Sequence, residues 1–487
     1  MPPMIQSSRF IYFIAGFVSI LLSCWIFQQT ELINSDGVCY VESAALMNQG
    51  LHQAMHLCGQ AEWPFYSILI FSVHAITNFS FENSAYFLNA LLTLMSVLIF
   101  IRIVDVLRLN KKGNLILWLA AFVILFSNIF NDVRHYIVRD HGYFSFYLLA
   151  ILSLLQFFRN YKWYYALWWG FASIIAMLFR IEGAVFFVLI PIIAFFDVKY
   201  PFLHRLKSFL QLNIFLIVSV IILSVMFLFY SDEALGRLRE INSNHALMFI
   251  AVFQAKSAVF KQFLFNRHAM VDPHIILFFT LIMWYLYSVV SNVSFIYMIL
   301  IIYAWCKRLL KAQPMMHVVM WSYLSLNVAL TALFLAAHMF LSKRYLVAES
   351  LVLMLWVPFA LAAILSQWQS RKWIVIIVAT LLAFSSIGGL VEFGYSKRYI
   401  RDAGNWLQQH VPANAKLYTN DFLIKYYSKH FGNDIFANIS DAKIDVENYD
   451  YIAIRQNKKN KKTQQIPLEP IQTFQNSRGD QVIIYRR

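Results

Sequence analysis

The stretch RFIYFIAGFVSILLSCWIF, residues 9–27, contains one charged residue, Arg9, followed by eighteen uncharged and mainly apolar ones. A transmembrane helix needs roughly 20 such residues to cross the hydrocarbon core of a bilayer. A cleaved signal peptide has a similar character, but no small-residue cleavage site precedes the acidic stretch that follows. We therefore expect a retained first membrane helix with the N-terminus in the cytoplasm.

The rest of the chain continues this pattern. Of its 487 residues, 60% are hydrophobic and 13% are charged, with 45 Phe, 26 Tyr and 13 Trp. A soluble domain cannot bury so much apolar surface, whereas lipid solvates it. The composition predicts a polytopic α-helical membrane protein. We expect about 11 transmembrane helices, over residues 10–28, 84–106, 113–130, 142–158, 163–179, 184–198, 208–230, 284–306, 315–340, 348–366 and 373–391. Two shorter apolar stretches, 64–79 and 274–283, are expected to lie at the interface or to be re-entrant.

The formal net charge of +15 does not indicate nucleic-acid binding, because of where the cations lie. Fifteen Lys and Arg belong to residues 397–487, and most of the others flank apolar segments. The eleven spans place fifteen Lys and Arg on the inner side, and thirteen of the fifteen Asp and Glu before Glu392 on the outer side. This asymmetry follows the positive-inside rule. It predicts a multi-pass protein of the inner (plasma) membrane.

The C-terminal residues 392–487 have a different composition, polar and without long apolar runs. The stretch SKRYIRDAGNWLQQHVP predicts a helix that stops at Pro412, and AKLYTND and DYIAIR predict strands. The stretch IQTFQNSRGDQVIIYR predicts a hairpin that turns near Arg478 and Gly479. We expect residues 1–391 to form a membrane domain with a first outer loop at 29–83, and 392–487 to form a small α/β extracytoplasmic domain.

Several basic residues fall on the outer side, where orientation does not explain them. Three short outer loops present them beside an acid, namely Asp140, Glu182 or Glu349. The arginine fork suits the phosphate of an anionic lipid, although such residues also snorkel to the interface or pair with nearby acids. The outer basic residues of these loops are Arg134, Arg139, Arg180, Lys343 and Arg344.

The first outer loop contains NSDGVCYVESAALMNQG, residues 34–50. Asp36 precedes a short apolar-periodic stretch, so it is a candidate N-cap of a helix. It is equally a candidate general base that removes a proton from an acceptor hydroxyl or amine. Glu42 lies further along the same predicted helix and is a candidate supporting acid.

Cysteine and histidine in this loop suggest other roles. Cys39 and Cys58 either form a disulfide, if the loop faces an oxidising compartment, or pack as small apolar residues. His52 and His56 are four residues apart and can share a helix face, but no third ligand accompanies them. The sequence therefore identifies no metal site, and whether a divalent metal is a cofactor stays open.

The layout of these features resembles the GT-C glycosyltransferase superfamily. The resemblance lies in an Asp shortly after the first membrane helix, in Trp63-Pro64-Phe65-Tyr66, in the outer Arg139-Asp140 and in KRYL at 343–346. It extends to a closing outer domain that contains DAGNWLQQHVPANAKLYTND. The branch that it resembles holds the protein O-mannosyltransferases and the lipid A aminoarabinose transferases.

The resemblance implies a transferase that takes a sugar from a polyprenyl-phosphate donor and passes it to a lipid, glycan or protein acceptor on the outer face, with inversion. Asp36 would be the catalytic base and Asp140 the second-loop acid. Arg344 and Tyr345 would approach the lipid phosphate, and chemistry and placement add Arg139, Arg180 and Lys343, with Glu182 as support. Many relatives have a second acid after the first-loop Asp, where this chain has Gly37.

Three other classes of protein remain as alternatives. A lipid-linked oligosaccharide flippase or other transporter would carry ionisable residues within its spans. An O-antigen polymerase or ligase also uses outer arginines, but with its large loop late in the chain. A non-catalytic scaffold would present the tail domain without a cavity that joins Asp36 to Arg344.

Overall fold

A computed structural model describes residues 7–108, 114–218, 244–264, 272–366, 372–391, 393–412, 414–430, 446–458 and 466–487. The chain divides into two compact units. Unit 1 consists of residues 1–23, 89–134 and 139–390, and unit 2 of residues 24–88, 135–138 and 391–487.

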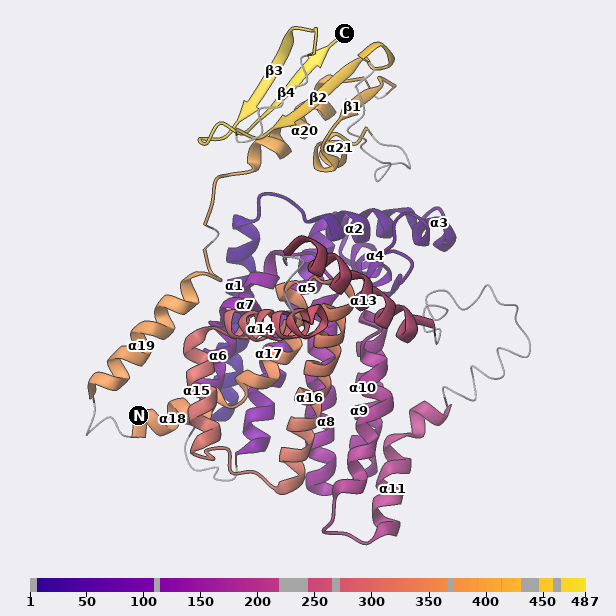
Figure 1. Cartoon of the computed structure of the whole chain (residues 1–487). Coiled ribbons are helices and arrows are strands. Elements are labelled where there is room, and N and C mark those ends of the chain that lie inside the picture. Colours follow the sequence, from indigo (N-terminus) through magenta and orange to yellow (C-terminus); the bar gives the residue numbers. More distant parts are fainter. Residues whose placement is uncertain are drawn as a thin grey trace. The chain divides into compact units, whose positions relative to one another are not determined.

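Long apolar helices dominate unit 1 (Figure 1). Helices α1 and α5 contribute residues to both units. The helices that contribute to unit 1 are α1 (Ser8–Gln29), α5 (Phe81–Leu107), α6 (Leu115–Leu125), α7 (Asn128–Asp132), η2 (Val133–His135), α8 (Asp140–Asn160), α9 (Trp163–Phe179), α10 (Gly183–Leu189), η3 (Ile190–Phe196), α11 (Phe202–Leu212), α13 (Asn244–Leu264), α14 (Pro273–Val293), α15 (Phe295–Cys306), α16 (Pro314–His338), η5 (Lys343–Leu346), α17 (Val347–Met354), α18 (Val357–Ser366) and α19 (Lys372–Ile387).

Helix α8 is a central element of unit 1. It packs along α9 and α16, as Figure 1 shows, and its polar residues at helical spacing meet those of α5. His141 Nδ1 lies 3.1 Å from Thr93 Oγ1, and Ser145 Oγ lies 2.9 Å from Ser96 Oγ. Hydrogen bonds of this kind hold apolar helices together in lipid, at about 0.6 kcal/mol each.

Five described helices, α1, α5, α8, α14 and α16, are long and apolar enough to cross a bilayer. Two bent pairs raise the number to seven if each pair is one span: α6 with residues 128–135, bent by 46°, and residues 343–354 with α18, bent by 42°. The described residues therefore do not show the expected eleven spans.

The difference has local causes. The predicted span 284–306 is broken at Ser294, whose φ is +82°. Helix α14, which is of spanning length, begins at Pro273 instead, so the expectation that 274–283 lies at the interface or is re-entrant is wrong, and the span is shifted rather than lost. The predicted spans at 163–179, 184–198 and 373–391 form helices shorter than a full crossing. Most of the predicted span 208–230 lies outside the described residues.

Unit 2 contains the first outer loop and the C-terminal segment. The loop helices are α2 (Ser35–Leu46), α3 (Leu51–Met55) and α4 (Phe65–Thr77). Helix α4 has 13 residues, about 20 Å at 1.5 Å per residue, which is too short to span the roughly 30 Å hydrocarbon core. The C-terminal elements are α20 (Arg398–His410), β1 (Leu417–Thr419), α21 (Phe422–Ser428), η6 (Val446–Asn448), β2 (Tyr451–Gln456), β3 (Pro470–Gln475) and β4 (Gln481–Arg486).

The C-terminal strands form a mixed sheet in the order β1-β2-β4-β3. Strand β1 is parallel to β2, and β4 is antiparallel to both β2 and β3. The helix, strands and hairpin expected from the sequence are present, and Gly479 takes the positive φ of +91° in the hairpin turn. Helix α20 buries Ile400, Ala403 and Leu407 against Val482 and Ile484 of the sheet.

Helix α21 was not expected from the sequence. Asp421 caps its N-terminus by accepting a 2.8 Å hydrogen bond from the Leu423 amide. It crosses α20 at Gly404, where a Cβ would lie 2.5 Å from the Cβ of Tyr427. The absence of a side chain at Gly404 therefore permits the close approach of the two helices.

Candidate functional site

Asp36 lies in the first turn of α2 rather than at its N-cap. The helix begins at Ser35 and its N-cap is Asn34, so the N-cap interpretation of Asp36 is wrong. The side chain of Asn34 instead binds the backbone of Ile137, accepting from its amide at 2.8 Å and donating to its carbonyl at 3.3 Å. A carboxylate in a first helical turn is stabilised by the helix dipole.

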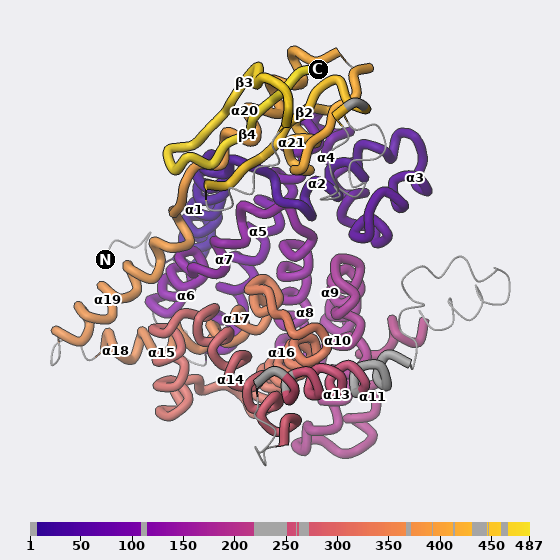
Figure 2. Tube along the Cα trace, turned by 45° about the horizontal axis from the view of Figure 1, so that its top comes forward, coloured from indigo at the N-terminus to yellow at the C-terminus, as the bar shows by residue number. Residues whose placement is uncertain are grey.

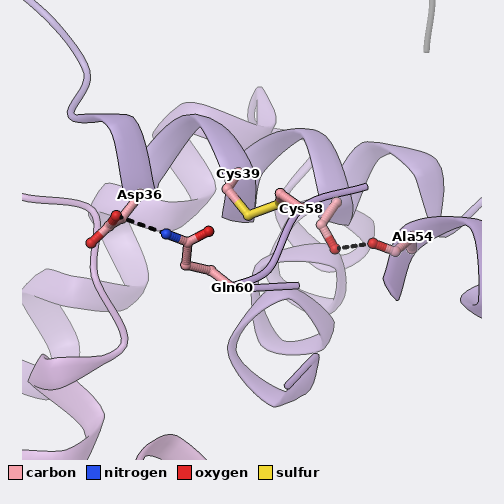
Figure 3. Close-up of a disulfide and its surroundings, with 6 residues drawn as sticks. Asp36, Cys39, Ala54, Cys58 and Gln60 are labelled. Atoms are coloured by element: carbon pink, nitrogen blue, oxygen red, sulfur yellow. Dashed lines mark hydrogen bonds between the residues drawn. A yellow bond between two sulfur atoms is a disulfide. The ribbon is translucent and has the colours of Figure 1, made fainter. Parts of the chain in front are cut away.

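The Asp36 carboxylate accepts a hydrogen bond from Gln60 Nε2 at 3.2 Å (Figure 3). Gln60 follows Cys58, which forms a disulfide with Cys39 of α2, with the two Cα atoms 6.2 Å apart. Ser43 adds a 3.0 Å hydrogen bond to the Ala54 carbonyl. The disulfide interpretation of the cysteines is confirmed, and the bridge fixes the segment that orients Asp36.

Gly37 occupies a position with no room for a side chain. A Cβ there would lie 2.7 Å from Asn34 Oδ1, 2.9 Å from Ile137 Cβ and 3.0 Å from Ile33 Cγ1. Residues 135–138 therefore pack against the backbone of α2 at the place where the resembling family carries a second acid. The packing around Gly37 therefore leaves no space for the acidic side chain that many members of the resembling family have at this position.

Glu42 forms an ion pair with Lys429, at 3.1 Å, so its carboxylate faces the end of α21. The same helix contributes the Tyr427 hydroxyl, which accepts a 3.0 Å hydrogen bond from the Ile33 amide. Burial raises the pKa of Tyr427 to about 12. The unexpected helix α21 thus helps to hold the loop at 29–83 to the C-terminal segment within unit 2.

The remaining predicted site residues belong to unit 1, and five of them form one cluster. We call Asp140, Arg180, Glu182, Arg344 and Tyr345 the arginine–tyrosine cluster. Asp140 begins α8, Arg180 ends α9 as its C-cap, and Glu182 precedes α10 as its N-cap. Three helix ends therefore bring these side chains together.

Arg180 connects the two acids of this cluster. It donates to Asp140, which is 3% exposed, and to both carboxylate oxygens of Glu182, at 2.6 and 3.3 Å. Burial alone would raise the pKa of Glu182. The charge and hydrogen bonds of Arg180, with a smaller contribution from Arg139, outweigh burial and lower that pKa to about 2. Glu182 is therefore held as a carboxylate at neutral pH.

Tyr345 lies between two guanidinium groups. Its ring centroid is 5.0 Å from Cζ of Arg180 and 5.3 Å from Cζ of Arg344. These distances are typical of cation–π contacts. The KRYL segment, helix η5, thus meets the end of α9, although more than 160 residues separate them in the sequence. Arg139 is the N-cap of α8, beside Asp140.

Helix α14 positions the KRYL segment, a role that the sequence did not reveal. Asn292 donates to the Lys343 carbonyl at 3.2 Å and to Ser350 Oγ at 3.1 Å. About two turns earlier on the same face of α14, Tyr285 donates to Glu349 at 2.6 Å, and Thr331 of α16 donates to the same carboxylate at 3.2 Å. Helix α17, which carries Glu349, accordingly lies among α14, α15 and α16 (Figure 2).

Arg134 is not an interfacial arginine. It is 1% exposed and donates to the Ser19 carbonyl and to the hydroxyls of Ser19 and Ser23, all at 2.9–3.3 Å. Its guanidinium also lies 5.3 Å from the Phe130 ring. This arginine joins the segment after α7 to α1, which removes it from the set of candidate phosphate ligands.

No group of three His, Cys, Asp or Glu side chains suited to one metal ion occurs among the described residues. The rings of His52 and His56 contact edge to face, with their centroids 4.3 Å apart. In unit 1, the Asp140 carboxylate is engaged by Arg180.

No family model and no curated protein matches this chain. Solved structures do. The apo oligosaccharyltransferase of Archaeoglobus fulgidus has a TM-score of 0.52 at 13% identity, covering 87% of this chain and 60% of that one. The same enzyme in complex with Zn and sulfate has a TM-score of 0.50 at 14% identity, with coverages of 82% and 55%. Mycobacterial arabinofuranosyltransferase AftD reaches a TM-score of only 0.43, which supports no inference.

At these identities the likeness is one of fold. The likeness to the archaeal oligosaccharyltransferase fits the mostly helical architecture of this chain. This chain spans 55–60% of the length of the archaeal enzyme. The class defined by the fold is a helical membrane protein whose architecture is similar to that of the archaeal enzyme.

Proposed function

We propose that this protein is an inverting membrane glycosyltransferase that moves a sugar from a polyprenyl-phosphate donor to a lipid, glycan or protein acceptor on the outer face of the membrane. The observation that carries the proposal is the arginine–tyrosine cluster, built from three helix ends and the KRYL segment on a fold shared with GT-C enzymes. Within the GT-C superfamily, we propose that this protein is related to the branch of protein O-mannosyltransferases and lipid A aminoarabinose transferases.

The contacts in the cluster suggest different roles for the different basic residues. Arg180 is engaged with two carboxylates, so its role is to orient Asp140 and Glu182 as well as to contribute positive charge. Arg344, with Tyr345, Lys343 and Arg139, supplies donors for the lipid phosphate. Guanidinium groups suit this task because they match phosphate oxygens with paired N–H donors.

The reaction would be a direct displacement. The acceptor oxygen or nitrogen forms a bond to the anomeric carbon while the bond from that carbon to the phosphate oxygen breaks. Asp36 takes the acceptor proton, and the polyprenyl phosphate leaves with the bonding electrons, stabilised by Arg344. One displacement exchanges the faces of the sugar, so the product is inverted.

The proposed displacement does not include a step that depends on a metal ion. The archaeal neighbour was solved with Zn and sulfate. In this chain Gly37 replaces a possible acidic ligand, Asp140 is bound to Arg180, and the described residues hold no group of three ligands. These residues do not fit a metal site of their own, and the chemistry is assigned to Asp36 and the arginines.

The disulfide supports the proposed location. A bond between Cys39 and Cys58 is expected to persist only in an oxidising compartment, which the outer side of an inner membrane adjoins. We therefore place the first outer loop and the C-terminal domain, residues 392–487, outside the cytoplasm, and the N-terminus inside. The membrane domain is residues 1–391.

The test is the substitution Asp36→Asn in the full chain, assayed for transfer of labelled sugar from polyprenyl-phosphate carriers in membranes. Loss of a general base lowers the rate about 10²–10⁴-fold. Glu62→Gln is the matched control, because it removes an exposed carboxylate from the same loop. Transfer by Asp36→Asn at the rate of Glu62→Gln, with equal protein in the membrane, would overturn the assignment. If the protein is a transporter or a scaffold, neither the wild type nor the Glu62→Gln control will transfer sugar.

A further inference from the structure

A polar cavity lies entirely within unit 2, and Asp36 is not one of its lining residues. Its volume is about 1000 Å³, at the upper end of the range of ligand pockets. Its lining comes from the end of α1, from residues 393–397 beyond α19, from the start of α20 and from the β3–β4 turn. Because α1 is an apolar helix of spanning length, the cavity adjoins a segment that we place at the membrane surface.

Four cations and two acids line this cavity. Arg455 is already paired with Asp421, at 2.6 Å. Lys397, Arg398 and Arg478 have no carboxylate within ion-pair distance among the described residues. The lining cations are Lys397, Arg398, Arg455 and Arg478, and the acids are Glu31 and Asp480.

The two acids are directed at neutral donors. Glu31 accepts from the Ser396 hydroxyl at 2.7 Å and from the Lys397 amide at 2.5 Å. Asp480 accepts from the Lys458 amide at 2.9 Å and from Asn476 Nδ2 at 3.4 Å. These hydrogen bonds shape the cavity wall and leave the Arg398 and Arg478 guanidinium groups available to an anion.

The rest of the lining suits a hydroxylated ligand. Gln28 and Asn457 offer amide donors and acceptors, and Tyr395 presents a ring that is 56% exposed, with Cζ of Arg478 5.3 Å from its centroid. We propose that this cavity binds a phosphate group together with its attached polyol, carried either on a membrane lipid head group or on a soluble phosphorylated sugar. The inference is independent of the transfer reaction and of Asp36.

The experiment measures binding to the purified full chain in an uncharged detergent. The lipid probe is dihexanoylphosphatidylglycerol, compared with dihexanoylphosphatidylcholine, and the soluble probe is glucose 6-phosphate, compared with glucose. We expect an anionic probe to bind and the double variant Arg398→Ala/Arg478→Ala to bind it at least about tenfold more weakly, because charge-assisted hydrogen bonds are lost. Binding of the lipid probe alone identifies a head group, and binding of glucose 6-phosphate alone identifies a soluble sugar.

Two further variants keep the test specific. Lys416→Ala removes one exposed cation from the same domain outside the cavity and should leave the affinity unchanged. Arg398→Lys/Arg478→Lys keeps the charge and should retain most of the binding. The proposal fails if neither anionic probe binds at millimolar concentration, if the alanine variant binds like the wild type, or if Lys416→Ala weakens binding equally.

Discussion

Replacement of Arg180 by Met isolates the energetic role of the arginine–tyrosine cluster. The side chains of Arg180 and Asp140 are 11% and 4% exposed, so the variant leaves a buried carboxylate without its cation. Loss of one partner of a buried ion pair costs about 3–5 kcal/mol. Glu182 is 38% exposed and solvent-screened, so its lost pair adds at most about 1 kcal/mol.

The pH dependence has a definite sign. The pKa of Glu182 is lowered from its ordinary 4.5 to about 2 in the folded protein. Its pairing therefore stabilises the fold above pH 4.5 and is lost as the pH falls through the interval down to about 2. The variant lacks this contribution at every pH. The difference in stability between wild type and Arg180→Met should thus be largest near neutral pH and should narrow in acid.

The assay is reversible or kinetic unfolding of the purified protein in detergent, followed by tryptophan fluorescence at neutral and acid pH. Asp140→Asn, combined with Arg180→Met, should recover much of the loss because it removes the unpaired charge. Arg139→Met is the matched control and should cost less than about 1 kcal/mol. Equal stability of Arg180→Met and wild type at neutral pH, or a difference that does not change in acid, would refute the reasoning.

Three other predictions concern unit 2. Gly37→Ala should destabilise the protein by about 1–2 kcal/mol, because the clash with Ile137 exceeds the gain in helix propensity; a raised unfolding temperature would contradict this. The double variant Cys39→Ser/Cys58→Ser should lose about 3 kcal/mol, measured by denaturant unfolding, and an unchanged midpoint would count against it. Gly404→Ala should lose about 1–3 kcal/mol in the same measurement, since its methyl group meets Tyr427, and a neutral result would disagree with the helix crossing.

Local patterns predicted the C-terminal elements well. Period-two strands and a glycine turn gave β2, β3 and β4 near their observed positions, and the amphipathic α20 stopped just before Pro412. Helix α21 was missed because its seven residues, FLIKYYS, are too few to show a helical period. Its Asp421 N-cap was the available signal, since Asp before a short apolar run is a helix start.

The sequence singled out the residues that meet in the arginine–tyrosine cluster, but not which of them contact one another. The sequence places Arg139 beside Asp140, yet Arg180, forty residues later, forms the ion pair with that acid. Glu349 follows Arg344 closely, yet it accepts hydrogen bonds from Tyr285 and Thr331. Such pairings depend on which helix ends meet in space, and hydropathy and charge order contain no information about that. The break at Ser294, which shifts the predicted span 284–306 back to Pro273–Val293, likewise has no proline or glycine that would signal it.

The bond between Cys39 and Cys58 also bears on the order in which the chain matures. Its partners are only 19 residues apart, and both leave the ribosome before any residue of α8 is synthesised. The loop that carries Asp36 can consequently be oxidised and shaped while most of the membrane domain is still missing. The arginine–tyrosine cluster, by contrast, cannot form until Tyr345 has been synthesised. The short separation of Cys39 and Cys58 thus makes closure of the acidic loop independent of the helices that follow it, whereas the arginine–tyrosine cluster needs most of unit 1.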